Sequence, residues 1–442
     1  MPLPTEPDRP YDAIIIGAGI IGCAIALSMT RKGYRTLNID ALPAAGYGST
    51  SSSAAVIRTY YSTLDGTAMA LEGYHDWSDW RSCLEASAEE EDGLARFIET
   101  GTLVMKTPAD NHQKQVLEHA DTLKIPYRHW TADDIRNALP GYDLTCFAPA
   151  RTMDDDAFGT PTGGALQGGV FFPLGGYVDD PQLAARNLKD AAARRGADFR
   201  FNTRVVSIPV TANRVTGVVC ESGETIRAGI VINVGGPHSG RINALVEGAP
   251  GIRIGHRPLR QEVVQIRPPE SLGYSRQGLI VSDNDIGCYV KPGSGGQLMI
   301  GSQNPPCDPH LEMDPDDFSR DLTDRALTYA YRFSQRLPGL GVSQHPVGIA
   351  DLYDATDDWL PIYDRSDIDG YYLAIGTSGN QFKNAPVAGR LMADLITRCE
   401  DGGDHDRDPL QFRLRHVDHT LDTATFSRKR ELTRQSSFSV LG

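Results

Sequence analysis

Several patterns that would point directly to a reaction class are missing from this sequence. It contains no HExxH motif, no P-loop lysine and no GxSxG nucleophile elbow, so zinc-peptidase, P-loop NTPase and serine-hydrolase chemistry have no support. His238, His256 and His345 share no metal-ligand spacing, and we expect no metal site. The seven cysteines form no CxxC pair. Their odd number argues against a disulfide framework and favours reduced thiols in the cytoplasm.

Long runs of charged or apolar residues are also missing. The longest acidic block is residues 89–92, and the apolar window 13–29 is interrupted by three glycines and too short to span a membrane. The first ten residues are polar and proline-rich, unlike a signal peptide. A net charge of −14 disfavours nucleic acid and anionic membranes as partners. We therefore expect a cytoplasmic protein without a membrane span or a nucleic-acid partner.

The chain does contain a surplus of glycine in an otherwise ordinary globular composition. Its 442 residues are 40% hydrophobic and 23% charged, a length that corresponds to roughly two or three domains. The 45 glycines exceed an average share of about 7%. This surplus indicates many tight turns or many places where the backbone approaches a ligand closely.

The N-terminal residues predict a nucleotide-binding βαβ unit. Residues 12–16 are typical of a buried strand, residues 20–32 of a helix and residues 35–39 of a second strand. The small polar segment 44–55 follows. A flexible linker is one interpretation of it, but a linker here would split the nucleotide fold, so we favour a ligand-facing loop.

The first strand and the helix are joined by Gly17-Ala-Gly19-Ile20-Ile21-Gly22, and the second strand ends at Asp40. The three glycines allow a tight turn, close approach of a pyrophosphate and helix–strand packing. The helix N-terminus presents N–H groups and a positive dipole end to the phosphates. A carboxylate at Asp40 suits a ribose diol and disfavours a 2′-phosphate, so the motif predicts FAD or NAD rather than NADP.

Later segments alternate between helical and strand patterns. In chain order, these are a helix at 180–195, β-rich segments at 199–208, 214–220 and 228–234, antiparallel-like strands at 259–266, 286–291 and 297–301, a strand at 371–375, a loop at 376–386 and a helix at 387–397.

Three segments together resemble the D-amino-acid oxidase-like flavoproteins, and the sarcosine oxidase branch in particular. They are the glycine motif, the run Ser49–Tyr61 and the segment Ser378–Gly389. Looser matches are Thr203-Arg-Val205, Asn233-Val-Gly235-Gly-Pro237, Arg260-Gln261 and Leu298-Met-Ile-Gly301.

The resemblance covers most of residues 11–395 and implies an α/β plus α+β fold, in which a Rossmann-like FAD-binding domain is joined by a second, mostly antiparallel-sheet substrate domain. We expect residues 1–80, 152–250 and 336–400 to form the discontinuous FAD-binding domain. Residues 81–151 and 251–335 would form the substrate domain, and residues 401–442 a C-terminal extension.

The resemblance also implies which residues hold FAD. The expected contacts are Gly17, Gly19, Ile20, Ile21, Gly22 and Asp40 for the ADP half, Ser52, Ser53 and Ala54 along the pyrophosphate and flavin, Val205 at the adenine, and Gly376, Gly379, Asn380, Gln381, Phe382 and Lys383 at the flavin edge. Gly235 is a further expected contact of the cofactor.

Five residues match substrate-site positions in the sarcosine oxidase branch. Arg58 and Lys383 match a carboxylate clamp, and both residue types suit that task. Tyr61, Tyr289 and Tyr353 match positions in the same cavity, where tyrosine faces suit an amine. Surface ion pairs for the two cations and core packing for the three tyrosines are the structural alternatives.

Two departures from the family pattern affect the expected chemistry. Some branches attach the flavin through a cysteine just before the position of Tyr353 or a histidine after the second strand. This chain has Ala350, Asp351 and Leu352 at the first place and only serines and alanines at the second, so we predict non-covalent FAD. Some oxidases also carry an oxygen-assisting lysine and a histidine where this chain has Met299 and Gln303. Dioxygen and a protein or quinone acceptor therefore both stay open.

The predicted function is FAD-dependent oxidation of the C–N bond of a small amino acid, with a secondary or N-methyl amino acid favoured. Hydride transfer to flavin N5 would precede hydrolysis of the imine. The alternatives are a D-amino-acid dehydrogenase acting on primary amines and a catalytically silent flavin-binding subunit of a larger complex.

Overall fold

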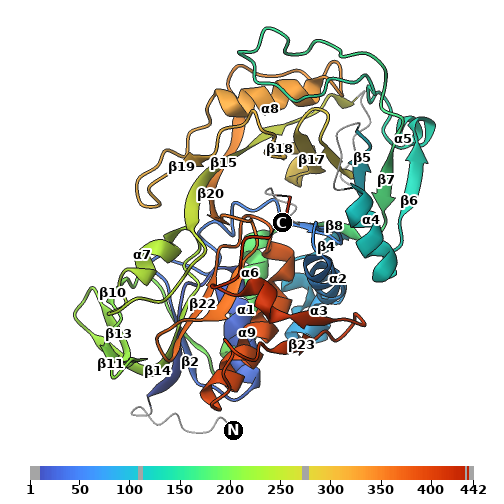
Figure 1. Ribbon diagram of the computed structural model, residues 1–442. Helices are drawn as coiled ribbons and strands as arrows, with labels where there is room; N and C mark the ends of the chain where they lie inside the picture. Colours follow the sequence, from blue (N-terminus) through green and yellow to red (C-terminus); the bar gives the residue numbers. More distant parts are fainter. Residues whose placement is uncertain (1–9, 108–112, 271–277, 434–435, 438–442) are drawn as a thin grey trace.

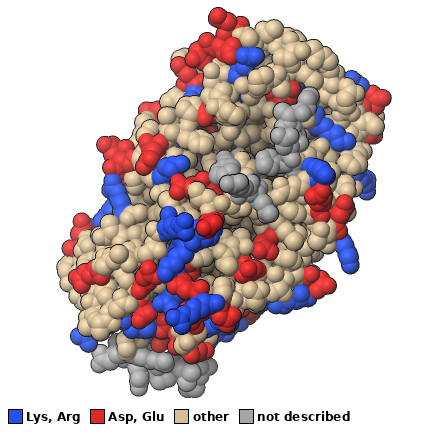
Figure 2. Space-filling model, viewed as in Figure 1, with Lys and Arg blue, Asp and Glu red and all other residues tan. Residues whose placement is uncertain are grey.

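The computed structural model describes residues 10–107, 113–270, 278–433 and 436–437. Two large sheets lie in different halves of the molecule, with helices against them (Figure 1). Acidic and basic side chains are interspersed over the face shown in Figure 2. None of the helices in the described part of the chain has both the length and the hydropathy needed to cross a bilayer. Residues 1–9, on which the expectation of no signal peptide rests, lie outside the described residues.

The first sheet is a parallel nucleotide-binding sheet with antiparallel additions. Strand β1 (Tyr11–Ile16) lies between β2 (Thr36–Ile39) and β14 (Thr225–Asn233) and runs parallel to both. The order is β10-β13-β14-β1-β2-β9, with β22 beside β14 and β21 beside β22. The other strands are β9 (Asp198–Arg200), β10 (Val205–Ser207), β13 (Gly217–Cys220), β21 (Ile362–Arg365) and β22 (Tyr371–Ile375).

Helix α1 (Ile20–Arg31) packs between two other helices, α6 (Pro181–Arg194) and α9 (Ala385–Glu400). The approach of α9 is close: a Cβ added at Gly389 would lie 2.5 Å from the carbonyl oxygen of Ala24. The predicted βαβ unit and the helix at 180–195 are confirmed. The last predicted helix begins at Ala385 rather than near residue 387, because a proline is accommodated in the first helical turn.

The β-rich segment predicted at residues 199–208 contains parts of two strands rather than one continuous strand. It is divided into β9, which pairs parallel with β2, and β10, which pairs antiparallel with β13. Asn202 lies between them with φ of +52°, a left-handed conformation that interrupts an extended chain and that asparagine tolerates.

The second sheet has nine strands in the order β19-β15-β18-β17-β16-β5-β7-β6, with β20 also paired to β15. All neighbours are antiparallel except β5 and β16. Helices α5 (Ala132–Ala138) and α8 (Asp324–Ser334) share one hydrophobic cluster with it. The strands are β5 (Thr102–Met105), β6 (Arg128–Thr131), β7 (Gly168–Phe172), β15 (His256–Ile266), β16 (Ile280–Asp283), β17 (Cys288–Pro292), β18 (Leu298–Ser302), β19 (Leu311–Glu312) and β20 (Val347–Thr356).

A small three-stranded sheet positions part of the candidate site. It has the order β3-β8-β4, formed by β3 (Val56–Arg58), β8 (Gly175–Val178) and β4 (Phe97–Glu99). Only two residues separate β7 of the nine-stranded sheet from β8, so this small sheet is directly connected to the large one. Helix α2 (Leu64–Ser78) follows β3 and contacts it.

The described part of the C-terminal extension is bound to the body of the protein. It contains β23 (Gln411–Arg413) and β24 (Thr420–Asp422), paired antiparallel. The buried carboxylate of Glu72 in α2 accepts hydrogen bonds from the backbone N–H groups of Arg415, His416 and Val417. Glu72 also lies 3.1 Å from the guanidinium of Arg390 in α9, so one carboxylate joins α2, α9 and the extension.

The α/β plus α+β fold class is confirmed by these two sheets. The division into domain segments stays a prediction. Two strands do not follow the predicted segments. Strands β7 and β20 lie within residues 152–250 and 336–400, which we expect in the FAD-binding domain, but both strands pair within the nine-stranded sheet. A strand pattern does not identify the partner strand, so the sequence could not show this pairing.

Candidate active site

The glycine turn between β1 and α1 has the geometry that a dinucleotide requires. Gly17 has φ of +117°, and a Cβ there would lie 2.4 Å from the carbonyl oxygen of Val234, beside Gly235. A Cβ at Gly19 would instead meet only one atom of the described chain within 4 Å, Oγ1 of Thr50 at 3.2 Å. The space in front of Gly19 is thus left open by the protein, which is where a pyrophosphate approaches in this motif.

The N-terminus of α1 and the carboxylate of Asp40 border this space. Helix α1 has no side-chain cap, although the N–H of Ile20 donates to Oγ1 of Thr50 at 3.1 Å. Asp40 accepts hydrogen bonds from the N–H groups of Ala18 at 2.7 Å and Leu42 at 2.8 Å. Burial raises the pKa of its carboxyl group. Each carboxylate oxygen keeps capacity for a further donor, such as a ribose hydroxyl.

The loop at residues 44–55 is attached to the glycine turn and is not a free linker. The N–H of Gly46 donates to the carbonyl of Ala18 at 2.8 Å, in addition to the Thr50 contact. Ser52 donates to the carboxylate of Asp351 in β20 at 2.5 Å. Ser53 and Ala54 lie between the anchored Ser52 and the start of β3 at Val56.

The predicted adenine contact, Val205, lies close to the predicted ribose contact. The N–H of Thr203 donates to the backbone carbonyl of Asp40 at 2.9 Å, which places the start of β10 next to the end of β2. The glycine cradle, the α1 N-terminus, Asp40 and Val205 together fit the ADP half of FAD.

Three predicted substrate-site residues meet around one aromatic ring. The ammonium of Lys383 lies 2.9 Å from the phenolic oxygen of Tyr61 and 5.0 Å from its ring centre. The guanidinium carbon of Arg58 lies 4.3 Å from the same ring centre. Lys383 also donates to the carbonyl oxygen of Asn380 at 2.7 Å, and the Tyr61 hydroxyl donates to that same oxygen. All three side chains are buried.

The electrostatics of this group are unusual because two cations are buried side by side. Burial and then the nearby charge of Arg58 hold the pKa of Lys383 well below its usual range. The ammonium donates hydrogen bonds to two neutral oxygens, those of the Tyr61 hydroxyl and the Asn380 carbonyl. Burial raises the pKa of Tyr61 to about 12, so its hydroxyl is protonated at neutral pH. An anion bound between the cations would relieve their repulsion and replace their lost hydration.

The predicted flavin-edge loop begins directly after β22. The N–H of Gly376 donates to the carboxylate of Asp354 at 2.6 Å. A Cβ at Gly379 would lie 2.3 Å from the ring of Tyr353, so only glycine allows this ring to lie against the loop. Gln381 accepts a hydrogen bond from Tyr363 at 3.2 Å, and the ring of Phe382 stacks 5.3 Å from Trp77.

The other two predicted tyrosines, Tyr289 and Tyr353, are partly buried and are called the tyrosine wall below. The ring of Tyr289 on β17 occupies the place where a side chain at Gly301 would extend, 2.5 Å from its Cβ position. Burial, and then the charge of the neighbouring Tyr353, raises the pKa of Tyr289, and burial raises the pKa of Tyr353. The loop that carries Gly379 and Asn380 thus joins the Tyr353–Tyr289 wall to the Lys383–Tyr61–Arg58 group.

Sequence reasoning missed a third buried cation near this wall. Lys291 lies two residues from Tyr289 on β17, so both side chains are on the same face of the strand. Its ammonium lies 4.1 Å from the ring centre of Tyr177 on β8. Burial lowers its pKa to about 8. A lysine within the apolar run 288–291 was the available signal.

Two further residues that support the loop were also missed. Asp354 holds Gly376, as described, and the indole N–H of Trp77 donates to the carbonyl of Lys383 at 2.9 Å. Neither has a local sequence signature, because each acts on a segment distant in the chain. Among the described residues, no group of three or more His, Cys, Asp and Glu side chains is placed to hold a metal ion.

Comparison with known proteins agrees with the geometry. Residues 12–395 match the family described as FAD dependent oxidoreductase. The chain is 26% identical over 408 residues to glycine oxidase of Geobacillus kaustophilus (strain HTA426), covering 89% of this chain and 95% of that protein. It is 25% identical over 403 residues to peroxisomal sarcosine oxidase of Mus musculus, covering 87% and 92%.

The fold is also found among solved structures. L-proline dehydrogenase from P. horikoshii superposes with a TM-score of 0.71 at 22% identity, covering 89% of this chain and 99% of that one. Because the family match spans most of the chain, FAD is its cofactor and oxidation–reduction is its chemistry. This protein belongs to the FAD-dependent oxidoreductase family to which the D-amino-acid oxidase-like enzymes give their name.

Proposed function

We propose that this enzyme oxidises the C–N bond of a small amino acid, with a secondary or N-methyl amino acid as the favoured class. The observation that carries the proposal is the pair of buried cations, Arg58 and Lys383, on the ring of Tyr61. A substrate carboxylate is the anion that such a pair suits: a guanidinium binds it through a planar fork and an ammonium through a point charge.

The remaining residues would orient the amine. Tyr289 and Tyr353 supply partly buried aromatic faces, and an amine is attracted to such faces. Bound FAD supplies a hydride acceptor for the carbon next to nitrogen, and water then hydrolyses the resulting imine. Fixing the carboxylate at one end determines where this carbon lies, so the protein contributes mainly positioning and exclusion of water.

Dioxygen is the acceptor that we propose for the electrons. Some oxidases carry an oxygen-assisting lysine where this chain has Met299. In this protein Lys291 lies directly opposite Met299 in the β17–β18 pairing. Positive charge is therefore present one strand away, where it would stabilise the negative charge that forms as dioxygen takes two electrons and two protons to become hydrogen peroxide. Rapid reoxidation by air, slowed in Lys291→Met, supports this acceptor. Slow reoxidation of the unaltered enzyme would contradict it.

Non-covalent FAD and the cytoplasmic location stay predictions. At the position where some branches carry a linking cysteine, Asp351 is paired with Ser52 and lies 2.9 Å from Arg320. Acid precipitation is expected to leave all flavin in the supernatant, and flavin in the pellet would contradict the prediction.

Anaerobic mixing with a panel of amines tests the function. N-methylglycine, other N-methyl amino acids, cyclic imino acids and primary D-amino acids are each added to the FAD-loaded protein, and flavin absorbance is followed. Bleaching by secondary amines supports the proposal. Bleaching only by primary D-amines would favour a D-amino-acid dehydrogenase, and no bleaching by any amine would favour a silent flavin-binding subunit.

A further inference from the structure

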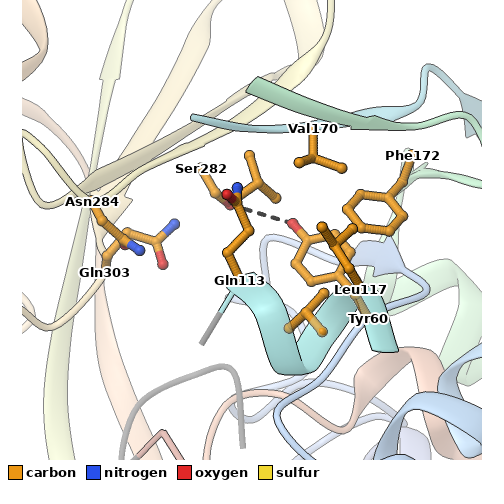
Figure 3. A pocket seen from close by; sticks show the side chains of 10 residues that line it. Tyr60, Gln113, Leu117, Val170, Phe172, Ser282, Asn284 and Gln303 are labelled. Atoms are coloured by element: carbon orange, nitrogen blue, oxygen red, sulfur yellow. Dashed lines mark hydrogen bonds between the residues drawn. The ribbon is translucent and has the colours of Figure 1, made fainter. Parts of the chain in front are cut away.

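A pocket lined by Tyr60, which lies two residues from Arg58 of the proposed clamp, is shown in Figure 3. It is enclosed by helix α4 (Gln113–Thr122) and by strands β5, β7 and β16 of the nine-stranded sheet. Its walls are mainly apolar, as is usual for sites that bind small ligands. The apolar side chains that line it include Val104, Val116, Leu117, Val170 and Phe172.

Tyr60 connects this pocket to Arg58. The ring of Tyr60 lines the pocket and lies 4.8 Å from the ring of Phe172. The guanidinium carbon of Arg58 lies 5.2 Å from the Tyr60 ring centre, and Arg58 donates to the Tyr60 carbonyl at 2.5 Å. One ring is therefore shared by the pocket and the clamp.

Ser282 connects the pocket to the tyrosine wall. It lines the pocket and lies 3.5 Å from the Tyr60 hydroxyl, the contact drawn in Figure 3. In the β16–β17 pairing Ser282 stands directly opposite Tyr289, and opposite residues of an antiparallel pair project to the same face. The pocket thus opens on the same side of the sheet as the proposed substrate cavity.

The lining also determines which chemical groups the pocket accepts. All of its described lining residues are uncharged, and its polar members are hydroxyl and amide side chains such as Gln303. A charged group would lose its hydration here without an ionic partner, at high cost in free energy. An alkyl or aromatic group would gain about fourfold in affinity for each buried methylene.

We propose that this pocket binds an uncharged apolar substituent of the amino-acid substrate, so the preferred substrate is larger than N-methylglycine. The inference rests on the proposed function, because the carboxylate clamp fixes the end of the substrate from which the substituent extends. The substrate class is an amino acid with an uncharged apolar substituent on its nitrogen or α-carbon.

A series of N-alkylglycines tests the inference by the anaerobic rate constant of flavin reduction divided by the dissociation constant. From N-methyl to N-propyl to N-pentyl, this specificity ratio is expected to rise by about fourfold per methylene until the pocket is full. N-(2-carboxyethyl)glycine, which places a charge in the pocket, is expected to fall below N-propylglycine. A matched series of α-substituted amino acids shows which atom carries the substituent.

Variants on α4 provide the controls. Leu117→Trp narrows the pocket and should reverse the preference for N-pentylglycine over N-methylglycine, whereas Leu117→Ala should move the optimum to longer chains. Glu118→Trp places the same bulk on the exposed side of the helix and should leave the preference unchanged. A specificity ratio that is flat or falls with chain length, or equal effects of the two tryptophan variants, would overturn the inference. Reduction by no amine at all would instead remove the proposed function on which it rests.

Discussion

The ammonium of Lys383 lies 2.9 Å from the hydroxyl oxygen of Tyr61, and the guanidinium of Arg58 lies over the same ring. Residues 58 and 383 are far apart in the sequence, yet the β3–α2 segment and the loop after β22 bring both cations to one buried site. The two positive charges repel each other, and an anion bound between them would attract both and offset that repulsion.

The titration of Lys383 predicts how carboxylate binding depends on pH. Burial, and secondarily Arg58, lowers its pKa. As the pH rises through this lowered pKa, the ammonium loses its charge and the Michaelis constant for a carboxylate substrate should rise. Arg58→Gln removes the neighbouring positive charge, so the pKa of Lys383 should rise and the increase in the Michaelis constant should begin at higher pH. Substrate binding, measured before the first turnover from pH 6 to 10, checks this. If binding weakens at the same pH in the variant and in the unaltered enzyme, the effect of Arg58 on the pKa of Lys383 is contradicted.

Lys291→Met should stabilise the protein at neutral pH. Burial lowers the pKa of Lys291 to about 8, so at pH 7 the folded protein carries a charged and poorly solvated ammonium. Removing it should raise the free energy of unfolding by about 1 to 3 kcal/mol.

The gain from Lys291→Met should shrink as the pH rises. Between pH 8 and the ordinary lysine value of 10.5 the unfolded chain binds more protons than the folded one, so the unaltered protein gains stability with pH and the variant does not. Denaturant unfolding at pH 7 and pH 9.5 measures both differences. A variant that is less stable at pH 7 would contradict the burial argument.

Gly19→Ala should fold but bind FAD poorly. Within the described protein its Cβ has room beside Thr50, whereas a pyrophosphate needs that space. We expect a loss of at least roughly 1.4 kcal/mol, a tenfold rise in the dissociation constant of FAD. Gly93→Ala, where a Cβ would meet no atom of the described chain within 4 Å, is the control. Equal FAD affinity in both variants would exclude the proposed approach of the cofactor at Gly19.

Glu72→Ala should be strongly destabilising although it lies outside the proposed chemistry. The substitution would leave the Arg390 guanidinium beside Asp76 but without its Glu72 partner, and three backbone N–H groups of the extension without their acceptor. A cost of about 3 to 5 kcal/mol is expected for losing one partner of a buried ion pair. Urea unfolding measures it, with the exposed Glu118→Ala as the control. A loss below about 1 kcal/mol would show that the extension is not held by this carboxylate.

The elements that the sequence predicted well are those with local signals. The βαβ unit at residues 11–40 was predictable because strand, glycine turn, helix and acidic strand end follow one another directly. The residue set around Tyr61 came from the family resemblance, and the structure brings Arg58 and Lys383 together on its ring. Their roles in substrate binding stay predictions.

Long-range relationships were not predictable from the sequence. The pairing of β20 with β15 and the contact of Glu72 with residues 415–417 join segments separated by many residues, and no local pattern encodes such partners. Lys291 was overlooked for a related reason. Its burial depends on Tyr177 of another sheet, so its position in an apolar strand was the only local sign.

The most direct test of the central claim compares N-methylglycine with N-methylglycinamide, which lacks the carboxylate, in anaerobic stopped-flow reduction of the FAD-loaded enzyme and its Arg58→Ala variant. The clamp predicts that N-methylglycine reduces the flavin of the unaltered enzyme roughly tenfold to a hundredfold more efficiently than the amide does. This ratio corresponds to the free energy of one charge-assisted hydrogen bond. The clamp also predicts that Arg58→Ala removes most of this preference, while the amide reduces the variant as it does the unaltered enzyme. Equal reduction of both compounds by the unaltered enzyme, or an equal loss with both in the variant, would contradict the carboxylate clamp.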